Sequence, residues 1–258
     1  MEIITSRTNP LCTHFRKLAS SRSYREKTGE CLCDSPKLLK EAELWGQTVT
    51  AVMYTEGVEL PPLSGPARVV QVTESVMRSV SPMETPQGVV FSCAMASTDP
   101  PERLEPGRYL LLDGVQDPGN VGTILRTADA FGWTVLLLPG CADLYNPKTI
   151  RAGMGVHFRR ASYVCSLEQA ASLVRTAGLS LYATALLEDT ADVRDVALSR
   201  CAVVIGSEGR GISKEALALC DRTVKIPMSG TCESLNAAVA AAVVLWEGAR
   251  TDGRDGTC

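Results

Sequence analysis

The chain has few histidines, few aromatic residues and no long apolar run free of charge. Its 258 residues include two histidines, His14 and His157, and 5% aromatic residues. No C-x-x-C pair occurs, and Cys31 and Cys33 form the one close cysteine pair. A zinc site needs about four well-spaced ligands, so the sequence predicts no metal. Without an apolar run of about 18 residues, no membrane span is expected.

The first residues, Met1-Glu-Ile-Ile-Thr-Ser-Arg7, also lack the apolar core of a secretory signal. We therefore interpret the ten cysteines as reduced thiols of a cytoplasmic protein. The net charge of −3 gives no general excess of positive charge, so binding to nucleic acid would need a local basic patch. A hydrophobic content of 45% is enough for folded cores.

The order of apolar and polar segments predicts two α/β units. Residues 1–96 alternate helices, expected after Asn9-Pro10 and near 35–45 and 73–80, with strands at 49–54, 67–72 and 88–94. Residues 97–107 are polar and proline-rich and indicate a linker. In residues 108–258, six expected strands (109–112, 134–138, 161–164, 180–185, 201–205 and 223–226) alternate with helices, which predicts a parallel sheet.

Basic residues gather near the start of the first unit. Between residues 3 and 27, Glu26 is the one acidic residue, while the basic side chains are Arg7, Arg16, Lys17, Arg22, Arg25 and Lys27. Such a run is a candidate RNA-binding surface because Lys and Arg pair with phosphates. A solvated helix face is the alternative.

The first of three motifs in the second unit is Asp117-Pro-Gly-Asn120-Val-Gly-Thr-Ile-Leu-Arg126. Its turn exposes backbone N–H groups at a helix start, where negative charge is favoured. Asn120 could cap that helix. Arg126 carries a rigid planar fork that suits phosphate, although a surface arginine on a capped helix is equally compatible with the spacing.

The second motif, Gly206-Ser-Glu208-Gly-Arg-Gly211, directly follows an expected strand. Its glycines allow a ligand to approach the backbone closely. It matches neither the dinucleotide fingerprint nor a Walker loop. Because the Glu208 carboxylate would repel phosphate, the loop favours a neutral or cationic ligand over a nucleotide tail. A plain turn is the alternative.

The third motif runs from Lys225 to Asn236. Pro227 ends a strand, and Ser234 is the expected N-cap of a helix over 235–248. Asn236 lies in an otherwise apolar helix and needs a partner, catalytic or structural. Because residues 237–246 are apolar on every face, we expect burial on all sides, either in a homodimer interface or in one large core.

Together these motifs resemble motifs 1, 2 and 3 of the SpoU (TrmH-like) RNA 2′-O-ribose methyltransferases of the SPOUT superfamily, which use S-adenosylmethionine (SAM). The resemblance implies an α/β fold with a parallel-sheet SPOUT domain, a deep trefoil knot and a homodimer. It implies that Arg126 is catalytic, as base or as phosphate positioner, with Asn120, Glu208, Ser234 and Asn236 in the active site. The implied SAM-contacting positions are Gly206, Ser207, Gly211, Ile226, Pro227, Met228, Ser234 and Leu235.

The first unit resembles the L30e-like RNA-binding extension of the same family through Ile4-Thr-Ser-Arg7-x-Asn9-Pro10, Tyr24-Arg-Glu-Lys-Thr-Gly29 and Thr85-Pro-Gln-Gly-Val89. Two stretches depart from the family pattern. Cys31-Leu-Cys-Asp-Ser35 replaces the usual F-x-V-E-G, and Gly153 stands where Ser is usual in R-A-S-x-G-A-x-F.

The resemblance predicts methyl transfer from SAM to a ribose 2′-hydroxyl of RNA, with ribosomal RNA favoured over transfer RNA because of the amino-terminal extension. Two alternatives of other classes remain open. One is a non-catalytic RNA-binding or ribosome-assembly protein on the same fold, which SAM binding would distinguish. The other is a nucleotide-binding α/β domain, which Glu208 and the missing phosphate-binding patterns disfavour.

Overall fold

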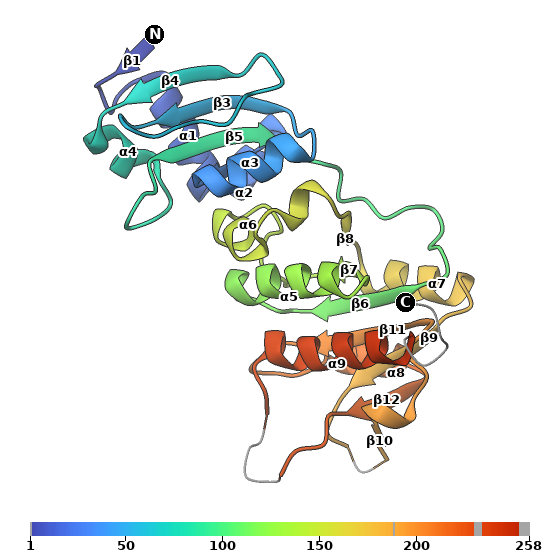
Figure 1. The fold of residues 1–258 in the computed structure, drawn as a ribbon. Helices are drawn as coiled ribbons and strands as arrows, with labels where there is room; N and C mark the ends of the chain where they lie inside the picture. The colour runs from blue at the N-terminus through green and yellow to red at the C-terminus, as the bar shows by residue number, and fades with distance from the viewer. Residues whose placement is uncertain (1, 188, 230–233, 253–258) are drawn as a thin grey trace. The chain divides into compact units, whose positions relative to one another are not determined.

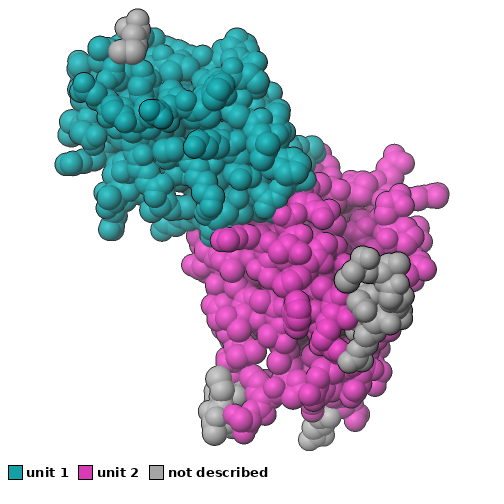
Figure 2. Space-filling view, viewed as in Figure 1, with its two compact units in different colours: residues 1–97, 143–159 teal, residues 98–142, 160–258 magenta. Residues whose placement is uncertain are grey.

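The computed structural model describes residues 2–187, 189–229 and 234–252. These residues form two separate β-sheets (Figure 1). One compact unit comprises residues 1–97 and 143–159, and the other comprises residues 98–142 and 160–258 (Figure 2). No helix within the described part of the chain is both long and apolar enough to cross a membrane.

The first unit holds a five-stranded sheet in the order β1-β4-β3-β5-β2. Its strands are β1 (Glu2–Ile4), β2 (Glu30–Asp34), β3 (Val49–Tyr54), β4 (Arg68–Val72) and β5 (Val89–Ala94). Its helices are α1 (Pro10–Ser20), α2 (Arg22–Thr28), α3 (Pro36–Leu44), α4 (Glu74–Val80) and α6 (Pro147–Gly153), with a 3₁₀ turn at Val156–Phe158. β5 runs antiparallel to β2 and β3, whereas β1, β4 and β3 are parallel.

The second unit holds a seven-stranded parallel sheet in the order β10-β12-β9-β11-β6-β7-β8. Its strands are β6 (Arg108–Asp113), β7 (Thr134–Leu137), β8 (Ser162–Val164), β9 (Ser180–Thr184), β10 (Ala191–Asp192), β11 (Cys201–Gly206) and β12 (Arg222–Lys225). Its helices are α5 (Pro118–Ala130), α7 (Leu167–Thr176), α8 (Lys214–Leu219) and α9 (Ala237–Asp252), with a 3₁₀ turn at Val193–Asp195. This confirms the predicted α/β class and parallel sheet; the knot stays a prediction.

Local sequence explains where several helices begin. Asn9, Ser35, Asp117 and Asn146 each accept a backbone hydrogen bond as N-cap, and a proline occupies the first helical position after each. Because Asp117 caps α5, the expected cap at Asn120 is wrong. The expected cap at Ser234 is also wrong: the Asn236 carboxamide oxygen accepts the N–H groups of Ala238 (2.9 Å) and Val239 (3.3 Å), so α9 begins later.

Residues 143–159, which the sequence pattern assigned to the second unit, belong by their contacts to the first. Asp143 forms an ion pair with the buried Arg25, and Arg151 of α6 pairs with the buried Asp34. This segment also explains the unusual glycine. A Cβ at Gly153 would lie 2.9 Å from the Cε1 atom of the His157 ring, so the ring fills the space that a serine side chain would occupy.

Candidate active site

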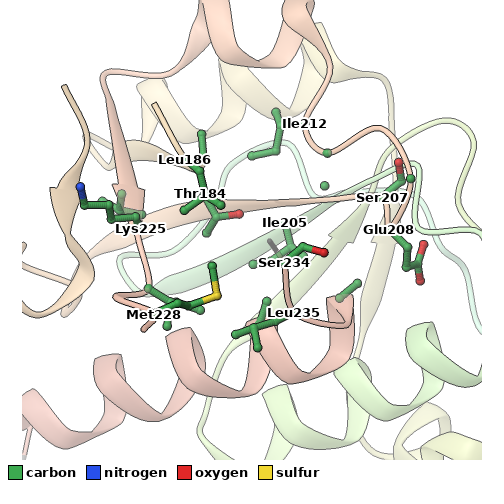
Figure 3. Close-up of a pocket in the computed structure, with 18 of the residues that line it drawn as sticks. Thr184, Leu186, Ile205, Ser207, Glu208, Ile212, Lys225, Met228, Ser234 and Leu235 are labelled. Carbon is green, nitrogen blue, oxygen red and sulfur yellow. The ribbon is translucent and has the colours of Figure 1, made fainter. Parts of the chain in front are cut away.

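A cavity of about 560 Å³ opens at the carboxyl ends of β9, β11 and β12 (Figure 3). Strand ends of an open parallel sheet are where ligands bind in α/β folds. Thr184 ends β9, and Ala185 and Leu186 follow it. The end of β11 and the loop after it contribute Ile205, Gly206, Ser207, Glu208, Gly209, Gly211 and Ile212. The end of β12 and the residues after it contribute Val224, Lys225, Ile226 and Met228. The remaining lining residues are Leu217, Ser234, Leu235, Ala237 and Ala240. The cavity therefore lies entirely within the second unit.

The second motif forms a tightly closed loop. Ser207 and Gly211 exchange two backbone hydrogen bonds, each of 3.0 Å, and the Ser207 hydroxyl accepts the Arg210 N–H at 3.3 Å. A Cβ at Gly206 would lie 2.2 Å from the Gly211 carbonyl carbon and 2.3 Å from the Ile212 nitrogen. Position 206 thus requires glycine because the loop backbone folds back against it.

Most of the expected SAM-contacting residues reach this cavity. Gly206, Ser207, Gly211, Ile226, Met228, Ser234 and Leu235 line it, whereas Pro227 does not belong to the lining. Residues 230–233 of the third motif lie outside the described residues. The sequence did not point to the β9 wall, Thr184–Leu186, or to the apolar Ile212 and Leu217. The one available signal was the expected strand 180–185, whose neighbours in the sheet the sequence does not reveal.

A chain of hydrogen bonds joins the three motifs. The Glu208 carboxylate can only accept, so the Asn120 carboxamide turns its Nδ2 toward Glu208 Oε1. Asn120 Oδ1 is left to accept from Asn236 Nδ2, at 3.1 Å. Asn236 Oδ1 in turn accepts from the first N–H groups of α9. The orientation of both carboxamides, Asn120 and Asn236, is therefore fixed by their partners. Through them the Glu208 carboxylate is linked by hydrogen bonds to the positive end of α9.

Arg126 is exposed on α5 and does not line the cavity. Within the described ranges, no residue accepts a hydrogen bond from its guanidinium or forms an ion pair with it. All of its donors therefore face solvent in the isolated chain. The structure brings Asn120, Glu208 and Asn236 together and places Ser234 at the cavity, whereas Arg126 belongs neither to this hydrogen-bond chain nor to the cavity lining.

The cavity has opposite charges at its two sides and apolar walls between them. Glu208 and Lys225 lie at opposite sides of the view in Figure 3, with Ile205, Leu235 and Met228 between them. Such a site fits an uncharged or zwitterionic ligand with an apolar portion better than a polyanion.

The basic residues of the first unit differ in their availability. Arg25 is 3% exposed, and it holds Asp143 and the Leu18 carbonyl (2.6 Å), so its guanidinium is not on the surface as the sequence analysis expected. Arg22 pairs with Glu26 at 2.7 Å. The other four basic residues lie wholly or partly at the surface: Arg7 donates to Ser75 (2.6 Å), Arg16 to the Arg7 carbonyl (3.0 Å), Lys17 lies 5.4 Å from the Tyr24 ring centre, and Lys27 is exposed.

Two family models match the chain. The SpoU rRNA Methylase family matches residues 107–246, and the MRM3-like substrate binding domain matches residues 9–90. A crystal structure of an SAM-bound rRNA methyltransferase from Sinorhizobium meliloti superposes with a TM-score of 0.85 at 29% identity, covering 97% of this chain and 98% of that one.

Curated relatives resemble the chain over different lengths. The 23S rRNA (guanosine(2553)-2′-O)-methyltransferase RlmP of Bacillus subtilis is 33% identical over 95% of this chain and 98% of its own length. The tRNA (guanosine(18)-2′-O)-methyltransferase of Thermus thermophilus is 39% identical, but over 57% of this chain and 77% of its own. The chain that carries these three linked motifs belongs to the SpoU rRNA methylase family.

Proposed function

We propose that this chain transfers a methyl group from SAM to a ribose 2′-hydroxyl of ribosomal RNA. The observation that carries the proposal is the cavity whose edge is fixed by the Glu208–Asn120–Asn236 hydrogen bonds. The SpoU family and the full-length similarity to an rRNA 2′-O-methyltransferase support it. The tRNA enzyme matches 57% of the chain, whereas the rRNA enzyme matches 95% of it, which is why ribosomal RNA is favoured.

The residues of the cavity fit SAM. Its volume, about 560 Å³, lies within the range of small-molecule sites. Gly206 lets the loop fold back on itself and so shapes the cavity, the Ile205 and Leu235 side chains supply apolar walls, and the Glu208 carboxylate favours a cation. When bound, SAM supplies a methyl carbon already activated by its sulfonium. The chain has to hold the 2′-hydroxyl about 3 Å from that carbon and in line with it.

Arg126 is proposed to act on the RNA. Arginine stays protonated in proteins, so it is a poor base. Its solvent-facing fork can instead hold the phosphate next to the reacting ribose and stabilise the alkoxide as the proton leaves. Because Arg126 does not line the cavity in one chain, this role requires RNA, a second copy of the chain, or both to complete the site.

A homodimer is part of the proposal. Of the two accounts of how α9 is buried, the single large core is wrong, because Val239 is 50% exposed and Trp246 is 55% exposed in the isolated chain. The homodimer account stays a prediction. Val239 and Trp246 are seven apart and lie on one face of the helix, with the half-buried Ala242 and Val243 between them. An apolar stripe of this kind fits a partner helix. Light scattering at micromolar concentration measures the mass, and a monomer would contradict the dimer.

The activity is tested with purified chain, SAM carrying a labelled methyl group, and three RNAs: ribosomal RNA from a strain lacking this gene, transfer RNA from the same strain, and ribosomal RNA from the parent. We expect label at one ribose 2′-oxygen of the first RNA and none in the third, which is already methylated. Label in transfer RNA alone would change the substrate. SAM binding without label in any RNA would favour a non-catalytic RNA-binding protein. A cytoplasmic location also remains a prediction.

A further inference from the structure

Three cysteine thiols meet inside the first unit, which contributes no residue to the cavity. Cys31 and Cys33 lie on β2, and Cys93 lies opposite Cys31 in the register of the antiparallel β2–β5 pair. The Cys93 Sγ is 3.5 Å from the Cys31 Sγ and 3.9 Å from the Cys33 Sγ, and all three sulfurs lie within 4.8 Å of one another. Each residue is at most 1% exposed.

These sulfur separations match those around a single thiolate-bound cation. With metal–sulfur bonds of about 2.3 Å, three ligands in a plane place their sulfurs about 4.0 Å apart, and a tetrahedral arrangement places them about 3.8 Å apart. The separations of 3.5 and 3.9 Å differ from these values by small side-chain rotations. A linear two-sulfur site would hold its sulfurs about 4.6 Å apart, which neither Cys93 pair approaches.

The number of ligands selects the kind of metal. Across the described positions, no histidine, carboxylate or fourth cysteine joins this group. Structural zinc sites have four protein ligands, whereas this group offers three, each at most 1% exposed to solvent. Soft thiolates favour Cu(I) among the ions that accept fewer ligands. A disulfide would use two sulfurs and leave the third thiol buried beside it.

We propose that Cys31, Cys33 and Cys93 form a three-thiolate site for a soft monovalent cation of the Cu(I) class. Binding is a ligand exchange without change of oxidation state: three metal–sulfur bonds form, and the three thiol protons leave to solvent. The sequence predicted no metal because Cys93 is 60 positions from Cys33 and no spacing pattern links them.

The site has a structural consequence. β2 is an edge strand and pairs with β5 alone. A cation held by both strands would fix β2, and with it the helix α2 that precedes it and carries the basic Arg22 and Lys27. Transient opening of this edge strand offers the buried thiols a route to solvent. The role is thus to stiffen the unit that resembles a substrate-binding domain, and it leaves the methyl-transfer residues untouched.

The test uses the full-length, reduced chain under anaerobic conditions. Cu(I) is supplied as its complex with a colorimetric chelator, and the copper retained per chain is measured in competition. We expect one equivalent in the parent and an affinity lower by about 100-fold or more in Cys31→Ala, Cys33→Ala and Cys93→Ala, since even outer-shell changes cost 10- to 100-fold. The control is Cys12→Ala, which removes another fully buried thiol of the same unit and should keep the copper.

X-ray absorption on the copper-loaded parent provides an answer that does not depend on whether the variants fold. Three sulfurs at about 2.3 Å would support the site. Two sulfurs, or no copper retained against the chelator, would overturn it. Loss of copper from Cys12→Ala to the same extent as from Cys93→Ala, or a Cys31–Cys93 disulfide in a parent chain that takes up no copper, would overturn it as well.

Discussion

Asn236 donates from Nδ2 to Oδ1 of Asn120 at 3.1 Å, although the two residues are 116 positions apart. This bond fixes the orientation of the Asn120 carboxamide, because its other end must donate to Glu208. The Glu208 carboxylate is therefore held at the cavity edge by an amide that itself is held by α9. Three separate motifs form one positioned group in this way.

Changing Asn120 to Asp should break that group. The new carboxylate cannot donate to Glu208 and places a second negative charge beside it. Losing a hydrogen bond to a charged group costs about 1.5–3 kcal/mol, so we expect single-turnover methyl transfer to fall about 10- to 100-fold. Asn146→Asp is the control, because the Asn146 cap only accepts from Lys148 and Asp does the same. Equal rates for the two variants would show that the Asn120 amide does not matter.

Arg126→Lys should slow turnover and spare SAM affinity. Lysine keeps the charge but loses the planar fork. If Arg126 orients phosphate and stabilises the alkoxide, removing that contribution should cost about 10²-fold or more in rate at saturating RNA and SAM. Arg175→Lys, an exposed arginine on α7, is the control. A rate within a few-fold of the parent would mean that Arg126 is not catalytic.

Gly206→Ala should damage the SAM site, whereas Gly65→Ala, in the first unit, should not. The added Cβ at position 206 meets backbone at 2.2–2.4 Å, while nothing lies within 4 Å of one at position 65. The loop must shift to relieve the first clash, and overpacking of this kind costs about 1–3 kcal/mol, so SAM should bind about tenfold more weakly or worse. Calorimetric titration with SAM measures both variants. Similar affinities would place SAM away from this loop.

Charge reversal at Lys17, Arg22 and Lys27 should weaken RNA binding and leave SAM binding unchanged. Each lost phosphate contact should reduce the salt slope of RNA affinity by about 0.7–0.9. The control reverses Lys37 and Lys40, exposed lysines on α3 of the same unit. An unchanged slope in the triple variant would leave this surface as a solvated helix face. Arg25 is excluded, because it is buried and its loss would leave the Asp143 carboxylate without its ion-pair partner and destabilise the unit.

Acid should destabilise the fold through His157. Its Nε2 lies 3.0 Å from the Leu144 carbonyl, and burial lowers the pKa of His157 from 6.5 to about 4. Because the unfolded chain binds this proton first, the contribution to stability is complete above pH 6.5 and is lost as the pH falls toward 4, on the order of 3 kcal/mol in all. Urea unfolding at several pH values should show a flatter acid loss for His157→Gln. Parallel curves would contradict the assignment.

The sequence predicted most elements of both sheets because long apolar runs such as Val49–Tyr54 and Cys201–Ile205 leave few alternatives. Helix starts are harder to predict, since Ser234 and Asn236 are both good caps and the local pattern does not choose between them; in the structure the Asn236 oxygen caps α9. β10 has two residues and no periodicity to detect. The β9 wall of the cavity depended on strand order, which tertiary pairing sets and local pattern does not reveal.

Because residues 143–159 belong to the first unit, the two units cannot be separated by a single cut of the chain. The backbone passes from one to the other three times, after residues 97, 142 and 159. A protease cut within 98–107 would break one of these three connections and leave the other two intact. Residues 143–159 would then still pack in the first unit, so the two fragments would stay associated. Conversely, a fragment that starts at residue 104 would keep Asp143 and Arg151 but lose their ion-pair partners, Arg25 and Asp34. Asp143 and Arg151 would have to be replaced by neutral residues before the folding of the fragment could be compared with that of the whole chain.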